Sequence, residues 1–139
     1  MPDTVRDVMT ENPTTVEASA TLVDAAKIMK QENIGDVLVV ENGKVQGIVT
    51  DRDIVVRAIA AGDDPSQTSV RVIASTDLEV LDPDDSIGDA IRKMEQAAVR
   101  RLPVVEDGEP VGIVTLGDLA RVKDRDSALA DISSASPNN

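Results

Sequence analysis

The sequence contains no cysteine, no histidine and no aromatic residue. The absence of cysteine excludes disulfides and thiolate zinc sites, and no His or Cys cluster offers a transition-metal site. The commonest catalytic bases and nucleophiles are missing as well, because His, Cys and Tyr are all absent. We therefore expect a protein that is not an enzyme and that requires no metal or cofactor. Its core must be built from Val, Ile, Leu, Met and Ala.

The sequence also lacks any run of about 20 apolar residues, so no membrane span is expected. The N-terminal stretch is charged and has no apolar signal segment, which predicts a cytoplasmic location. Acidic residues number 26 and basic residues 14, which gives a formal net charge of −12. Such a surface repels phosphate backbones and anionic lipids, so neither nucleic acid nor a membrane is an expected partner.

What the sequence does contain is one unit written twice. A shift of 65 residues aligns 5–57 with 70–122 without a gap, and 15 of these 53 positions are identical. The longest shared block is Gly-Ile-Val-Thr-x-x-Asp, at 47–53 and again at 112–118. We expect one repeat over 3–62, a second over 68–124, and a polar tail over 125–139.

Each repeat has the pattern strand, helix, strand, strand, helix. Apolar residues at i, i+3, i+4 and i+7 from Leu22 predict a helix, and the same spacing recurs from Ile87. The segment 37–49 is typical of a hairpin that turns at Asn42-Gly43. A second helix is expected over 51–61, stopped by Gly62 and Pro65, and short strands are expected at 14–16 and 79–81. The predicted fold class is α/β (α+β).

These residues resemble a tandem pair of cystathionine-β-synthase (CBS) domains, also called a Bateman module. The resemblance lies in "VRDVMT", "IGDVLVV", "VRRLPVV", the two Gly-Ile-Val-Thr-x-x-Asp blocks and "TDRDIVVRAIAAG", and it covers about residues 3–124. It is closest to small stand-alone bacterial and archaeal CBS-pair proteins. It implies two CBS repeats with pseudo-two-fold symmetry, acting together in regulation and signal transduction.

The Thr-x-x-Asp spacing has two interpretations. In a capping box, the Thr hydroxyl and the Asp carboxylate satisfy free backbone N–H groups at a helix start. Thr21-x-x-Asp24 has the same spacing at a helix where no ligand is expected. Alternatively, a helix start after a strand favours an anion, and its carboxylate can accept two hydrogen bonds from a ribose diol. Gly47 and Gly112 would let another group approach the backbone. The two roles are not exclusive.

The resemblance implies specific ligand contacts in two clefts between the repeats. The ribose contacts would be Thr50 and Asp53 in one cleft, and Thr115 and Asp118 in the other. An apolar slot for adenine would be formed by Val16, Ile34, Gly35 and Val37, and by Val80, Val99, Leu102 and Pro103. The alternative for these apolar residues is ordinary core.

Phosphate groups need cations. The candidates are Arg52, Arg57, Arg100, Arg101 and Lys123. The alternative for each of these side chains is solvated surface charge. Arg52 is matched by Gly117 in the other repeat, and Arg101 is matched by Asp36. An anionic ligand would therefore feel unequal fields in the two clefts.

We therefore expect a regulatory module that binds an adenosine-type ligand (AMP, ADP, ATP or S-adenosylmethionine) and signals in trans to an effector protein. The alternative is a structural dimerisation or interaction module without a ligand. The segment 54–61 is apolar nearly all round, and such a helix is normally buried on more than one side. We expect a homodimer through the CBS helices. The alternative is that the repeats cover each other's helices within one chain.

Overall fold

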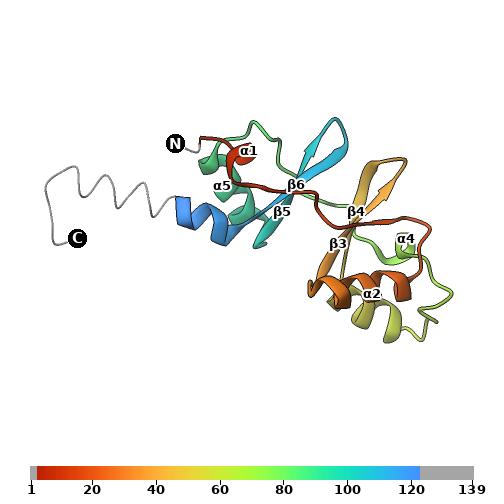
Figure 1. Cartoon of the computed structure of the whole chain (residues 1–139). Helices are drawn as coiled ribbons and strands as arrows, with labels where there is room; N and C mark the ends of the chain where they lie inside the picture. Colours follow the sequence, from red (N-terminus) through yellow and green to blue (C-terminus); the bar gives the residue numbers. More distant parts are fainter. Residues whose placement is uncertain (1–2, 123–139) are drawn as a thin grey trace, which may run out of the picture. The chain divides into compact units, whose positions relative to one another are not determined.

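The structure, a computed structural model, describes residues 3–122 and has the expected mixed α/β class (Figure 1). In chain order its elements are α1 (Val5–Val8), β1 (Thr10–Glu11), β2 (Thr15–Glu17), α2 (Leu22–Glu32), β3 (Asp36–Glu41), β4 (Lys44–Thr50), α3 (Asp51–Asp53), η1 (Ile54–Ile59), α4 (Val70–Ile73), α5 (Ile87–Ala97), β5 (Arg101–Glu106) and β6 (Glu109–Thr115). Helical residues 116–122 follow β6. The predicted tail and Lys123 lie outside the described residues.

The described chain divides into two compact units that interleave the two repeats. Unit 1 comprises 3–11, 79–104 and 112–122, and unit 2 comprises Asn12–Leu78 and Val105–Val111. The short helix α1, at the start of the first repeat, therefore belongs with the second repeat, and α4 belongs with the first. We call the segments 5–11 and 70–76 the arms.

Unit 2 is built on the three-stranded sheet β2-β3-β4. β2 runs parallel to β3, and β3 pairs antiparallel with β4 in the predicted hairpin. The turn residues Asn42 and Gly43 have φ values of 54° and 78°, as a type I′ turn requires. The central strand carries four consecutive buried residues, Val37, Leu38, Val39 and Val40.

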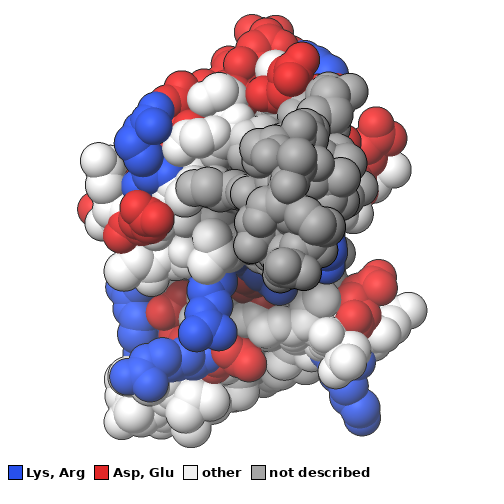
Figure 2. Space-filling model, turned by 90° about the vertical axis from the view of Figure 1, so that its left-hand side faces the viewer, with Lys and Arg blue, Asp and Glu red and all other residues white. Residues whose placement is uncertain are grey.

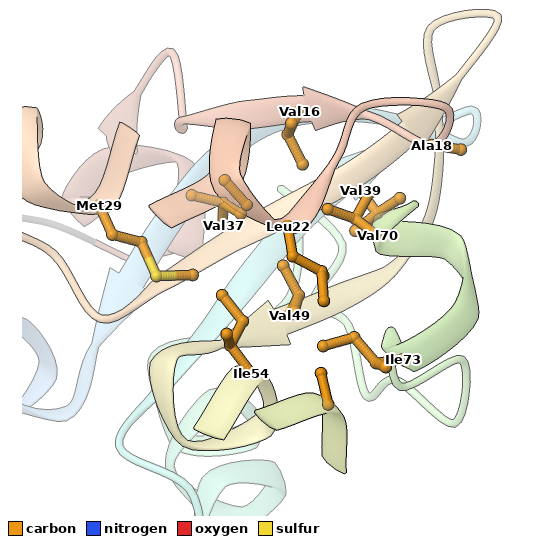
Figure 3. Packing of buried hydrophobic residues seen from close by; sticks show 12 residues of the cluster. Val16, Ala18, Leu22, Met29, Val37, Val39, Val49, Ile54, Val70 and Ile73 are labelled. Carbon is orange, nitrogen blue, oxygen red and sulfur yellow. The ribbon is translucent and has the colours of Figure 1, made fainter. Parts of the chain in front are cut away.

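The core of unit 2 lies between this sheet and the helices that cover it. Figure 3 shows side chains of α2, η1 and α4 converging on Val37, Val39 and Val49 of the sheet. Leu22 of α2 is fully buried, and burial of one such side chain contributes about 1.5–3 kcal/mol. As the missing aromatics require, aliphatic residues and Met29 fill this core.

Unit 1 contains the copy of the first helix and the greater part of the hairpin strands β5 and β6, whose turn is assigned to unit 2, but it has no first strand. Its sheet has the order β1-β6-β5. The strand expected at 79–81 is wrong, because only Leu81 forms a bridge there, to Val104. Prolines explain the loss. In unit 2 the amides of Leu38 and Ala18 hold β2 by donating to Thr14 O and Val40 O. The matching residues of unit 1 are Pro103 and Pro83, which have no N–H to donate.

The second helix of the first repeat differs from a continuous α-helix over 51–61. It begins with one α turn, α3, and continues as the π-helix η1, in which Ala60 N donates to Val55 O. Ile54 and Ala58 face the core in this wider turn. The sequence concealed the difference because the segment is apolar nearly all round and has no clear period. The helix ends at Ile59 with Ala60 as its C-cap, two residues before the expected end, and Gly62 lies in the turn that follows, with a φ of 83°.

The two arms occupy equivalent places in the two units. In unit 1, Thr10 of β1 pairs with Ile113 of β6. In unit 2, Ser75 pairs with Ile48 of β4 in the corresponding position. Among the described residues, no helix is both long enough and apolar enough to cross a bilayer.

Candidate functional site

Both Thr-x-x-Asp pairs form complete reciprocal caps where a hairpin strand becomes a helix. Thr50 N donates to Asp53 Oδ2, and Asp53 N donates to Thr50 Oγ1, each at 3.0 Å. In unit 1 the corresponding distances between Thr115 and Asp118 are 3.2 and 3.1 Å. The capping interpretation is confirmed. Each carboxylate keeps its other oxygen, Oδ1, outside the cap.

The two Oδ1 atoms have different surroundings. Arg121 Nη2 donates to Asp118 Oδ1, and the Arg121 side chain is 73% exposed. In the first repeat the position of Arg121 is occupied by Val56, so this partner is replaced by an apolar side chain. Within residues 3–122, Asp53 Oδ1 has no hydrogen-bond partner. Asp53 is therefore the more open acceptor of the two.

A backbone hydrogen bond joins each helix start to the segment that precedes the hairpin. Asp51 N donates to Gly35 O at 2.9 Å, and Leu116 N donates to Arg100 O at 2.7 Å. The sequence predicted both segments as parts of one site, and this bond brings them together in each unit.

In unit 1 these segments surround a hollow of about 450 Å³. Its lining residues are Arg100, Arg101, Thr115, Leu116, Gly117 and Ala120. The first three were predicted as site residues, and the last three were missed. Their signal was available, since they stand one, two and five positions after the Thr of the repeated Thr-x-x-Asp block, on a predicted helix. Arg100 and Arg101 bring two positive charges to one side of this hollow.

The corresponding positions of unit 2 carry mostly negative charge. Gly35 and Asp36 stand in place of the two arginines, and Asp51 and Arg52 stand in place of Leu116 and Gly117. The Asp51 carboxylate lies over Gly35, where a Cβ would meet its Oδ2 at 3.2 Å. Figure 2 shows a different face of the molecule, on which acidic side chains and Lys or Arg side chains both lie at the surface.

The predicted apolar wall residues differ in exposure. Val16 and Val37 belong to the buried core of unit 2, with Ile34 packed against it. In unit 1, Leu102 and Pro103 are buried and Val80 is half-buried. Val99, just before the arginines, is 38% exposed.

Arg57 and the two glycines Gly47 and Gly112, all proposed to serve a ligand, contact other parts of the chain instead. Arg57 Nη1 donates to Ile73 O at 2.8 Å, and this hydrogen bond joins η1 to α4. The close approach at Gly47 and Gly112 is made by the arms. A Cβ on Gly47 would overlap the Ser75 carbonyl oxygen, and one on Gly112 would overlap the Met9 side chain. The glycines are therefore needed for strand packing, which corrects their interpretation as openings for a ligand.

The CBS domain family model matches residues 5–59 and 70–125, which cover both repeats. The chain belongs to the CBS domain family. It is 47% identical over 116 residues to the CBS domain-containing protein YhcV of Bacillus subtilis, an alignment that covers 84% of this chain and 82% of YhcV.

Two solved CBS structures are similar to this chain. The crystal structure of Hypoxic Response Protein I with two coordinated zinc ions matches with a TM-score of 0.78 and 37% identity, over 85% of this chain and 97% of that one. The CBS domain pair of protein MJ0100, in complex with 5′-methylthioadenosine and S-adenosyl-L-methionine, matches with a TM-score of 0.75 and 28% identity, over 90% and 99%. This chain lacks the Cys and His residues that zinc favours.

Proposed function

We propose that this CBS-pair protein is a regulatory, non-enzymatic module that binds an adenosine-type ligand and signals in trans to an effector protein. The observation that carries the proposal is the hollow of unit 1, where Arg100, Arg101 and Thr115 meet beside the cap of Asp118. The adenosine-derived ligands in the similar MJ0100 structure support the same ligand class. AMP, ADP, ATP and S-adenosylmethionine are the candidates.

The proposed contacts follow from the chemistry of the strand-to-helix edge. Asp53 and Asp118 each keep Oδ1 outside the cap, and a ribose diol can donate hydrogen bonds to this atom. In unit 1 a ligand must displace Arg121 from Asp118, and the cost is small because the Arg121 side chain is mostly in solvent. Leu116 and Val99 are 37% and 38% exposed and offer apolar surface to adenine.

Calorimetric titration with adenosine, AMP, ATP and S-adenosylmethionine tests the proposal. We expect Asp53→Ala and Asp118→Ala to weaken binding at their own units by about 1.5–3 kcal/mol, the range for hydrogen bonds to a charged group. Asp24→Ala is the matched control, because Asp24 closes the same capping box on α2, where we propose no ligand. It should cost about 1 kcal/mol of stability and leave affinity unchanged.

The competing function is an interaction module without a ligand. It predicts that millimolar ligand produces neither heat nor a shift in melting temperature. It also predicts that all three Asp→Ala variants lose stability alike. That pattern would overturn the ligand-sensing proposal.

We also propose that two chains associate through η1. Val55, Val56 and Ile59 on this helix are 59%, 49% and 49% exposed, which is unusual for adjacent large apolar residues. Beside them lies an apolar groove of about 330 Å³ between α2 and η1. Light scattering should give a dimer mass for the unmodified protein and a monomer for Ile59→Glu. Gln46→Glu, at an exposed position of β4, is the control and should remain dimeric. A monomeric unmodified protein at tens of micromolar contradicts the dimer.

A further inference from the structure

The two strand-to-helix edges have the same backbone and opposite charge. Both have a reciprocal Thr–Asp cap and the hydrogen bond that joins the helix start to the segment before the hairpin. The side chains around this shared framework differ. Unit 1 places two guanidinium groups there, from Arg100 and Arg101, and one carboxylate, Asp118, which is paired with Arg121. Unit 2 places three carboxylates and one guanidinium there, from Asp36, Asp51, Asp53 and Arg52.

The shape of the two edges differs at the same positions. In unit 1 Gly117 carries no side chain, and a Cβ there would meet only Thr115 Oγ1, at 3.7 Å. The hollow therefore stays open in front of Thr115. In unit 2 the Asp51 carboxylate lies over Gly35 and is fixed by a hydrogen bond from Arg52 N at 2.8 Å. A negative group thus covers the surface that corresponds to Arg100.

Arginine is well suited to phosphate because its planar guanidinium can donate two parallel hydrogen bonds to phosphate oxygens. Within the described residues, the Arg100 side chain makes no ion pair or hydrogen bond. A phosphate group that entered the hollow would meet its guanidinium directly. In unit 2 the same group would approach the carboxylates of Asp36 and Asp51, and like charges at close range repel.

We propose that the two units select ligands by charge: the hollow of unit 1 binds the phosphate groups of a nucleotide, and the corresponding edge of unit 2 excludes phosphate and accepts an uncharged or cationic adenosine compound. This division rests on the proposed adenosine-binding function and assigns a ligand class to each unit. One chain can then report on two compounds that share an adenosine moiety.

The experiment compares adenosine, AMP and pyrophosphate by calorimetric titration at low and high salt. We expect one AMP per chain, bound about tenfold or more tightly than adenosine in unit 1, with the advantage shrinking as salt rises. Arg100→Ala should remove most of the advantage and leave the affinity for adenosine within about twofold. Arg92→Ala is the control, because it removes the same charge from the exposed face of α5 in the same unit and should change neither affinity.

A transplanted site provides a second test. Gly35→Arg combined with Asp51→Leu gives unit 2 the residue pair that unit 1 already accommodates around the same backbone hydrogen bond. Gly35 does not have a positive φ, so an arginine is compatible with its backbone. We expect this variant to bind a second AMP per chain. The variant's melting temperature shows whether it is folded, and Arg100→Ala tests the same proposal independently.

The outcomes separate this proposal from the general function. If adenosine and AMP bind equally and Arg100→Ala changes neither, the charge selection is overturned while adenosine binding stands. If pyrophosphate binds in an Arg100-dependent way and adenosine does not bind, the anion hollow is supported and the adenosine function fails. If none of the three compounds binds at millimolar concentration, both proposals are overturned.

Discussion

The two units are built from copies of one repeat, yet unit 2 has a first strand that unit 1 lacks. β2 of unit 2 pairs with β3 over three residues, whereas the matching segment of unit 1 makes the single bridge between Leu81 and Val104. Leu81 N still donates to Pro103 O at 2.9 Å, so the register is the same. The difference is two missing N–H groups, at Pro83 and Pro103. The segment at 79–81 therefore follows the path of a first strand without forming the hydrogen bonds of one.

The candidate sites show a second kind of difference. Residues shared by the repeats supply the caps and the close packing of the arms, as with Thr50 and Thr115 or Gly47 and Gly112. Residues that differ surround the site, as with Asp36 and Arg101. Shared positions thus maintain the framework, and variable positions set the charge that a ligand meets.

The largest expected effect is on the first strand of unit 2. Leu38→Pro removes the hydrogen bond to Thr14 O from a central strand, together with a buried side chain. We expect a loss of at least about 3 kcal/mol in the free energy of unfolding, measured by urea denaturation. The reverse change, Pro103→Leu, should cost less and add an amide protected from hydrogen exchange. Equal losses would show that the prolines do not cause the difference between the units.

The arm contacts should respond unequally to an added methyl group. Gly47→Ala meets backbone, the Ser75 carbonyl, and should cost about 1–3 kcal/mol because the arm must shift. Gly112→Ala meets the flexible Met9 side chain as well as Thr10 O at 3.0 Å, and we expect a smaller loss. Gly88→Ala on α5, with its nearest contact at 3.7 Å, is the control and should stabilise slightly. Thermal unfolding measures all three, and a larger loss at Gly112 contradicts the expected order.

A smaller effect is expected at Arg57, whose counterpart in the other repeat is Val122. Because Arg57 Nη1 donates to Ile73 O, Arg57→Ala should cost about 1 kcal/mol of stability. Its affinity for AMP should match that of the unmodified protein in calorimetry. A tenfold weaker affinity would return Arg57 to the phosphate-binding candidates.

The smallest effect is a loss of stability in acid, and we expect it in the arm at 5–11 but not in the arm at 70–76. Backbone N–H groups of Asp3 and Thr4 donate to Asp7 and hold the pKa of its carboxyl below the usual 3.8. The stability that this cap contributes to α1 is thus fully present above pH 3.8, and it is lost as the pH falls through the lowered pKa of Asp7. The counterpart of Asp7 on α4 is Val72, which does not titrate. Hydrogen exchange measured as the pH falls from above 3.8 through the lowered pKa of Asp7 should show the arm at 5–11 opening, and Asp7→Asn should remove this pH dependence. If the variant keeps it, other carboxylates are responsible.

The sequence was most informative where local chemistry acts. The hairpin turns at Asn42-Gly43 and Asp107-Gly108 follow from residues that tolerate positive φ, and all four have it. The first helices follow from apolar spacing and a capping residue at Thr21 or Ser86. These features depend on a few neighbouring residues, so a sequence pattern is sufficient to predict them.

Features that depend on distant residues were harder to predict. Neither arm is placed by its own pattern, because its partners at Ile113 and Ile48 are remote in the sequence. At the candidate site, Thr115 was found from its motif, while Gly117 was missed because its importance lies in the space it leaves. To predict that 79–81 forms no strand, one must know that Pro103 lies across the sheet from Glu79. Only the strand register gives this position.

Each arm belongs to the unit formed mainly by the other repeat. This arrangement decides the order in which the two cores can form during synthesis on the ribosome. The partner of Ser75, Ile48, lies only 27 residues earlier in the chain. All residues of the unit 2 core cluster have therefore been synthesised once the chain has passed Ile73. Thr10 must wait for Ile113, which closes a loop of 103 residues and carries a larger entropic cost. The first arm to be synthesised is therefore the last to pair. Until the second hairpin emerges, a nascent chain carries this arm unpaired, with the unit 2 core already able to form.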